Sequence, residues 1–240
     1  MDSITPQALA FGFLWYFAFL FSTTCHEAAH ALVARLGGDD TAYNGGQVTL
    51  NPLPHIEREP FGMVVIPILS YFMLGWTVGW ASAPYDPRWQ ERYPRRAALM
   101  ALAGPAANFI IMFAAAAGVW MGVAAGIFRA PSVVSIRALN GIVQAVDPDQ
   151  FGLLAAFLGM LFVLNLILGT FNLIPVPPLD GHTGIMLLLP ERQALRLIEF
   201  ARDRSFHLLG TLLAWYLYGK IINDIFFAGL KILYPSASYR

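Results

Sequence analysis

Residues 8–36 read ALAFGFLWYFAFLFSTTCHEAAHALVARL. The run is apolar for most of its length and exceeds the roughly 20 residues that a helix needs to cross the hydrocarbon of a bilayer. Toward its C-terminal end it nevertheless holds two histidines and a glutamate. Ionisable side chains inside a membrane helix are costly and are usually kept for a function. The stretch therefore predicts a membrane-spanning helix that carries a chemical site.

Four further apolar stretches follow, at about 61–82, 97–128, 151–174 and 206–233. The 240 residues are 57% hydrophobic and only 12% charged, whereas a soluble domain carries about 25% charged residues. The mean hydropathy is +0.57. These values indicate an all-α polytopic membrane protein. A formal net charge of zero gives no electrostatic reason to expect a nucleic-acid partner.

The apolar stretches predict about four crossing helices in one membrane-embedded domain over 1–240. We expect its core at about 8–185 and a C-terminal helix at 206–233. The turn-forming Asn44-Gly45-Gly46 and the β-branched run that follows it predict a short β-hairpin near 41–52.

The strongest chemical signal is His26-Glu27-Ala28-Ala29-His30. On a helix, positions i and i+4 share one face, so both imidazoles can reach one Zn²⁺ ion. Glu27 can then act as general base toward a water on that metal. A pair of buried histidines that hydrogen-bond to their neighbours is the other interpretation. The membrane-length helix favours the metal.

A catalytic zinc site usually has three protein ligands. Residues 171–181 read FNLIPVPPLDG, and Asp180 is the best candidate for the third ligand. The prolines end the fourth apolar helix and predict an extended segment, and Gly181 predicts a sharp turn. An Asp180 that caps the next helix is the alternative. Few other side chains at membrane depth can ligate a metal, which favours Asp180 as a ligand.

Together these motifs resemble the site-2 protease family of intramembrane zinc metalloproteases. The segments that carry the resemblance are the HExxH at 26–30 and NLIPVPPLDG at 172–181, with GPAAN at 104–108 and NPLPH at 51–55. It covers about residues 20–185, without a PDZ- or CBS-like insertion, and so implies a compact form. It implies one Zn²⁺ per chain, held by His26, His30 and Asp180, with Glu27 activating the water.

Three further polar residues are candidates near such a site. Asn108 can steady the substrate or the oxyanion, or can lie in a helix contact where Gly104 allows close packing. Asn172, which shares a helix face with Asn165, can orient the metal ligands or bridge two helices. His182 stands where relatives often have glycine. It can add a hydrogen bond near the metal, or it can be a tolerated variant at a helix start.

The metal also constrains the topology, because its ligands must lie at one membrane depth. Asp180 can meet the histidines only if 61–82 enters and leaves on one side, as a re-entrant or interfacial segment. This arrangement puts four cationic residues on the membrane face opposite the site and ten arginines on the face that carries the site. The ten are Arg35, Arg58, Arg88, Arg92, Arg95, Arg96, Arg192, Arg196, Arg202 and Arg204. By the positive-inside rule, the site then faces the cytoplasm.

The sequence thus predicts an integral protein of the lipid bilayer, in the plasma membrane of a prokaryote. Its expected activity is that of a zinc metalloendopeptidase that cuts transmembrane protein substrates in regulated intramembrane proteolysis. A non-proteolytic membrane zinc-binding protein, either a transporter or an inactive scaffold, is the alternative, although zinc binding alone would not need Glu27. A di-iron oxidase would need more ligands than the apolar region supplies. The sequence predicts no particular oligomeric state.

Overall fold

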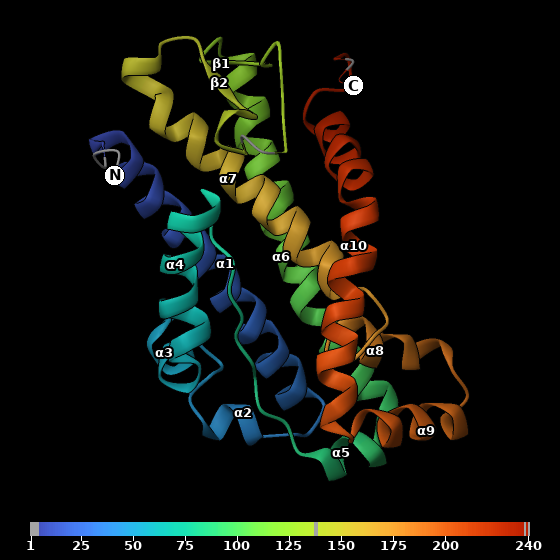
Figure 1. The fold of residues 1–240 in the computed structure, drawn as a ribbon. Coiled ribbons are helices and arrows are strands. Elements are labelled where there is room, and N and C mark those ends of the chain that lie inside the picture. The colour runs from blue at the N-terminus through green and yellow to red at the C-terminus, as the bar shows by residue number, and fades with distance from the viewer. Residues whose placement is uncertain (1–4, 137–138, 238, 240) are drawn as a thin grey trace.

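The computed structural model describes residues 5–136, 139–237 and 239, and it is built almost entirely of helices (Figure 1). Four long helices run up and down in sequence order: α1 (Pro6–Leu36), α6 (Pro94–Ala124), α7 (Pro148–Asn172) and α10 (Arg204–Leu233). α6 packs against both α1 and α7. The predicted all-α polytopic fold is confirmed.

Among the described residues, α1, α6 and α7 are the helices long and apolar enough to cross a membrane. α10 has 30 residues and therefore sufficient length. Its apolar run is diluted by His207, Lys220 and Asp224, and it is not among these three. Three of the roughly four predicted crossing helices thus meet the criteria of length and composition.

The long helices begin at signals that the sequence contains. The Thr5 hydroxyl accepts a hydrogen bond from the Ala8 N–H, and Pro6 occupies the first turn of α1. The Asp147 carboxylate caps α7 in the same way, and Asp203 caps α10. Such caps satisfy backbone N–H groups that have no partner inside the helix. They place the helix starts a few residues before the apolar runs.

One apolar core joins all four long helices. Its large buried side chains include Trp15, Phe19, Met112, Phe162, Met160, Tyr218 and Leu230. Large apolar side chains are also exposed on the outer surface, especially along the first half of α10. A surface of this kind suits contact with lipid rather than water.

The segment 61–82 leaves one end of the bundle and returns to that end. It rises as η1 (Phe61–Val65) and α4 (Ile66–Leu74), turns at Gly75 with φ +79°, and comes back in an extended conformation (Figure 1). The Trp80 N–H donates to the Gly62 carbonyl at 3.2 Å, so entry and exit lie side by side. This is the path that a re-entrant segment requires, with one helical and one extended arm.

The predicted β-hairpin near 41–52 is wrong. The segment contains α2 (Thr41–Asn44), then turns, and α3 (Leu53–Arg58) follows. The Asp39 carboxylate accepts from the Thr41 N–H at 3.0 Å, which favours a helical turn at that point. Gly46, at φ +72°, then ends the turn. Within the described residues, the only strands are β1 and β2, which pair with each other, so the β-prone run 47–50 has no strand with which to pair.

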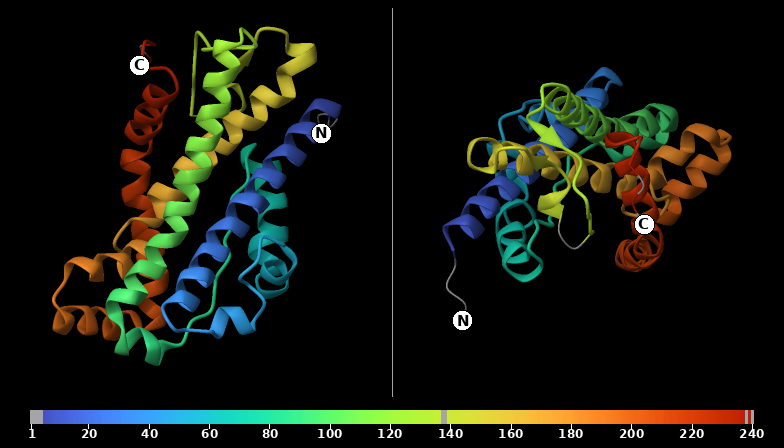
Figure 2. Two further views of the ribbon diagram at one scale, coloured as in Figure 1. Left: turned by 180° about the vertical axis from the view of Figure 1, so that it is seen from behind. Right: turned by 90° about the horizontal axis from the view of Figure 1, so that it is seen from above.

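The small sheet lies between α6 and α7 instead. There β1 (Phe128–Arg129) pairs antiparallel with β2 (Gln144–Ala145), near the short helix η2 (Leu139–Gly141). The opposite end of the bundle carries α2, α3 and α5 (Pro87–Arg92), together with α8 (Asp180–Gly184), η3 (Ile185–Leu188) and α9 (Glu191–Ala201). Figure 2 shows this division from behind, with both termini far from α5 and α9.

Candidate metal centre

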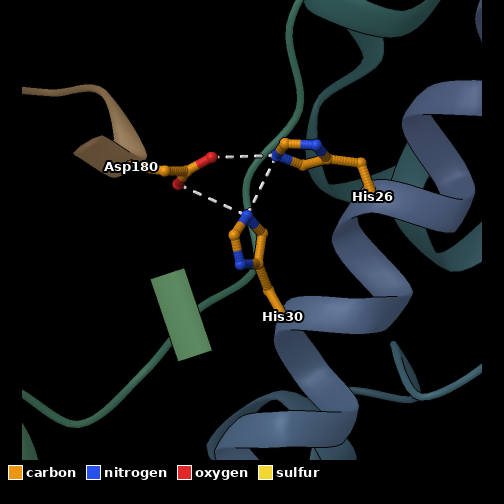
Figure 3. A group of neighbouring side chains, drawn as sticks. All are labelled: His26, His30 and Asp180. Atoms are coloured by element: carbon orange, nitrogen blue, oxygen red, sulfur yellow. Dashed lines mark hydrogen bonds and ion pairs between the residues drawn. The ribbon is translucent and has the colours of Figure 1, made fainter. Parts of the chain in front are cut away.

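Three side chains from distant parts of the chain converge inside the bundle (Figure 3). The Nε2 atoms of His26 and His30 lie 2.9 Å apart. His26 Nε2 lies 3.1 Å from Asp180 Oδ2, and His30 Nε2 lies 3.3 Å from Asp180 Oδ1. Both histidines are buried. Within the described residues, this is the one group of at least three such side chains that could hold a metal ion.

The histidines share a face because they are one helical turn apart on α1. Asp180 approaches them from the other side as the first residue of α8. The alternative reading of Asp180 as a helix cap does not describe the structure. Leu179 occupies the cap position, α8 has no side-chain cap bond, and the Asp180 carboxylate is directed at the imidazoles.

The segment between α7 and Asp180 is less extended than the prolines predict. It is a run of turns, in which the Val176 N–H donates to the Ile174 carbonyl and the Leu179 N–H donates to the Val176 carbonyl. The φ of Gly181 is not positive. A Cβ at this position would instead overlap the Leu173 carbonyl. Gly181 is therefore needed for close approach between α8 and the end of α7, and not for a sharp turn.

Gly104, which lies on α6, leaves space for the cluster of candidate ligands. A Cβ at Gly104 would overlap the Nε2 atoms of both His26 and His30. The predicted role in close packing therefore holds, but the atoms closest to this position belong to the two imidazoles and not to the backbone of a neighbouring helix. No local signal in the sequence distinguishes these two kinds of partner.

A chain of buried hydrogen bonds fixes the protonation of His26. Asn165 Nδ2 donates to the Leu161 carbonyl at 2.8 Å, so its Oδ1 must face Asn108, which donates to it at 2.8 Å. Asn108 Oδ1 then lies 2.6 Å from His26 Nδ1. This oxygen can only accept, so His26 Nδ1 carries the hydrogen and Nε2 keeps its lone pair. The structure thus shows Asn108 on α6 bonded both to a candidate ligand on α1 and to Asn165 on α7.

A backbone carbonyl orients the His30 ring in the way that Asn108 orients the His26 ring. Its Nδ1 lies 2.7 Å from the Met100 carbonyl, which is also purely an acceptor. Both rings therefore direct unprotonated Nε2 atoms toward each other and toward a carboxylate. Burial raises the pKa of Asp180, whereas a proton on the imidazole of His30 or His26 would lower it by more, so the carboxyl is ionised whenever a positive charge lies beside it.

This arrangement fits a metal cation. Two nitrogen lone pairs at 2.9 Å and a carboxylate repel one another unless positive charge lies between them. Two imidazoles and one carboxylate are a common ligand set of catalytic zinc, which keeps a fourth position open. Hydrogen bonds from the distal ring nitrogens to oxygen acceptors are the usual support for such ligands.

The other predicted residues lie around the cluster in different ways. Glu27 is buried beside His26 and close enough to His30 for an electrostatic interaction. Asn172 is half-buried at the end of α7. In the part of the chain described here, its side chain has no hydrogen bond to the three candidate ligands. His182 is buried on α8, where burial and the nearby His207 lower its pKa.

Two residues extend the polar network beyond the prediction. Asn165, considered above only as a partner of Asn172, is instead the link between Asn108 and α7. Its Nδ2 also donates to the Ser22 hydroxyl at 2.8 Å, and reasoning from sequence missed Ser22. The available signal was its position in the apolar run, one helical turn before His26. His55 remains apart, with its Nε2 3.2 Å from the Thr49 carbonyl.

A buried cluster of two histidines and a carboxylate, inside a bundle of membrane-length helices, is typical of membrane-embedded metalloproteases. Comparison with known proteins agrees with this class. The profile of Peptidase family M50 matches residues 14–202. The chain therefore belongs to Peptidase family M50, the site-2 protease family, as the sequence motifs predicted.

Two bacterial relatives illustrate the similarity. The chain is 35% identical over 170 residues to the Bacillus subtilis (strain 168) protein named "Putative zinc metalloprotease YwhC", a match that spans 70% of this chain and 66% of that protein. It is 29% identical over 217 residues to the Mycolicibacterium smegmatis (strain ATCC 700084 / mc(2)155) protein named "Putative zinc metalloprotease Rip2", over 88% and 71% of the two lengths. No solved structure matches significantly.

Proposed function

We propose that this chain is a zinc metalloendopeptidase that hydrolyses peptide bonds of membrane-spanning protein substrates. His26, His30 and Asp180 are the proposed ligands of one Zn²⁺ ion, and Glu27 is the proposed general base. The observation that carries the proposal is the convergence of three ligand atoms within 4.8 Å of one another. Membership of a peptidase family supports the hydrolytic role.

Each residue has a distinct chemical task in this proposal. A zinc ion, when bound, would polarise a peptide carbonyl and make a water more acidic. Glu27 accepts the proton of the attacking water and passes it to the leaving amine. It is buried on the same helix as the histidines, so little solvent competes for that proton. Asn108 and Asn165 hold the His26 ring with its lone pair directed at the cluster.

The substrate must reach the site as an unwound segment. A transmembrane helix engages its carbonyls in its own hydrogen bonds, so a helical substrate offers no free peptide group. Asn172, eight residues before Asp180, is the proposed partner of the substrate backbone or of the oxyanion. Its side chain is half-exposed and, among the described residues, is not hydrogen-bonded to the three candidate ligands. It could therefore bind substrate without breaking a bond to them.

The proposed location is the plasma membrane of a prokaryote, with the site toward the cytoplasm. Asp180 begins α8, which lies in the half of the bundle near α5 and α9 (Figure 1). That end carries Arg35, Arg88, Arg92, Arg95, Arg96, Arg192, Arg196 and Arg202, as the positive-inside rule requires of a cytoplasmic face. Both similar proteins above come from bacteria.

The test is the variant Glu27→Gln, measured beside the wild type with a membrane-spanning model substrate in proteoliposomes. We expect cleavage to be lost while zinc content, determined by elemental analysis, stays at one ion per chain. The variant Asp180→Ala should lose both. A Glu27→Gln protein that cleaves normally would remove Glu27 as the base. A wild type that binds zinc without cleaving any membrane substrate would favour the non-proteolytic alternative.

A further inference from the structure

A second cavity lies on the far side of α8 from the candidate ligands. Its volume is about 400 Å³, and α8, α9 and α10 enclose it together with residues 175–177. The walls are apolar and include Phe200, Phe206, Leu209 and Leu213. Binding pockets for small molecules have this size and this apolar character, with a few polar groups that orient the ligand.

Among the side chains that the structure describes, His182 is the one ionisable group in the wall of this pocket. It is only 7% exposed. Its Nε2 atom is buried and has no hydrogen-bond partner within the described part of the chain. A buried polar atom without a partner is destabilising. A ligand that bonds to Nε2 would satisfy this buried polar atom, for which the described protein supplies no partner.

The pocket is separate from the candidate metal centre. Residues two apart on a helix point about 200° away from each other. Asp180 faces the imidazoles of α1, so His182 faces the opposite way, toward α9 and α10. An occupant of the pocket would therefore not compete for the three candidate ligands.

The surroundings of the pocket indicate an apolar occupant from the bilayer. Next to the lining residues, α10 presents Leu208 and Leu212, which are 67% and 60% exposed. Such a surface suits lipid. Residues of both α9 and α10 line the pocket. These two helices meet near the arginine-rich end of the bundle (Figure 1), where the head groups of the bilayer are expected.

We propose that this pocket binds a single-chain amphiphile with a carboxyl or hydroxyl head group. The head group hydrogen-bonds to His182 Nε2, which can donate to a carboxylate or accept from a hydroxyl according to its tautomer. The hydrocarbon chain lies between Phe200, Phe206 and Leu213. Transfer of the chain from lipid to protein contributes little, since both are apolar. The hydrogen bond therefore makes the site selective.

Photolabelling tests the proposal with the intact protein in phosphatidylcholine nanodiscs. The probe is dodecanoic acid with a diazirine at the end of its chain, and labelled residues are mapped by mass spectrometry. We expect labels on Phe206, Leu209 and Leu213. Unlabelled dodecanoic acid or 1-dodecanol should compete at concentrations where dodecane does not. The two competitors distinguish a free fatty acid from a hydroxyl-bearing lipid.

Variants locate the site. His182→Leu should weaken competition by dodecanoic acid about five- to tenfold, the effect of one net hydrogen bond. Leu213→Trp should fill the pocket and abolish labelling there. Leu212→Trp is the matched control, because Leu212 is its exposed neighbour and does not line the pocket. Zinc content, measured alongside, checks that each variant is folded.

Three outcomes would overturn the proposal. Labels spread evenly over exposed residues of α10 would show simple partitioning into the bilayer. Equal competition by dodecane would remove the role of His182, and this result needs only the wild type. Protection by a membrane-spanning peptide, without competition by the acid, would assign the pocket to a polypeptide.

Discussion

The sharpest test of the candidate centre is at Asn165, which is linked through Asn108 to the candidate ligand His26. Asn165→Leu keeps the number and branching of the side-chain heavy atoms in a fully buried position but removes the acceptor that holds Asn108. Asn108 can then rotate and present its amide nitrogen to His26. In that orientation His26 Nδ1 becomes an acceptor, and the hydrogen moves to Nε2, which then cannot bind a metal.

The expected magnitude follows from the bonds that are lost. Asn165 takes part in three buried hydrogen bonds, with Asn108, Ser22 and Leu161, but only the bond to Asn108 leads to His26. A net hydrogen bond contributes about 0.5–1.5 kcal/mol. Loss of a partner that orients a metal ligand usually costs about 10–100-fold in metal affinity. We therefore expect the zinc Kd to rise by roughly 10–100-fold, or about 1.4–2.7 kcal/mol.

The assay is a zinc titration of the metal-free protein in detergent against a chromophoric chelator. Nitrogen NMR of labelled histidine, in the metal-free state, reports which ring nitrogen of His26 carries the hydrogen. Asn165→Asp retains an acceptor for Asn108 and should lose less affinity than Asn165→Leu. Thr170→Val is the control on the same helix, since the Thr170 hydroxyl bonds to the Leu166 carbonyl and Tyr218 outside the network.

A folded Asn165→Leu protein whose zinc Kd stays within about threefold of wild type would refute this reasoning, because the proposed loss is at least tenfold. An unchanged His26 tautomer would refute it independently. Either result would leave Asn165 as a residue that only bridges α6 and α7.

The other predictions concern the space around the cluster, the substrate and the metal. Gly104→Ala should lower zinc affinity by about fivefold or more, because overpacking typically costs about 1–3 kcal/mol. Gly118→Ala, whose Cβ would meet only the flexible end of Leu158, should bind zinc as wild type does. Gly181→Ala should reduce zinc content, because its Cβ must displace the start of α8 from the Leu173 carbonyl, and full occupancy in a folded variant would contradict that role. Asn172→Ala should lower kcat/KM at least tenfold through the proposed contact with substrate while zinc content stays normal; loss of zinc would place Asn172 in support of the ligands instead. Removal of zinc by a chelator should lower the free energy of unfolding by about 2.7 kcal/mol relative to free zinc at 100 times its Kd, and re-addition of zinc should restore both Tm and cleavage.

The sequence alone predicted the helical membrane fold and the candidate ligands, because the signals for them are local or compositional. The apolar runs defined the helices and lipid as the solvent, and the spacing of His26 and His30 defined a shared helix face. Asp180 must lie at the same membrane depth as the two histidines, and this requirement predicted that segment 61–82 begins and ends at the same end of the bundle. None of these inferences needed to know which side chain touches which.

Only the tertiary structure decided the contacts between residues far apart in the chain. Asn108 contacts His26 across 82 residues, and Asn165 contacts Ser22 across 143. A buried amide has several possible partners, and packing of α1, α6 and α7 selects among them. The same holds for Gly104 and Gly181, since glycine is required at these positions only because a neighbouring atom fills the space that a Cβ would occupy. The hairpin predicted at 41–52 failed for a related reason, because a strand requires a partner that its own sequence does not specify.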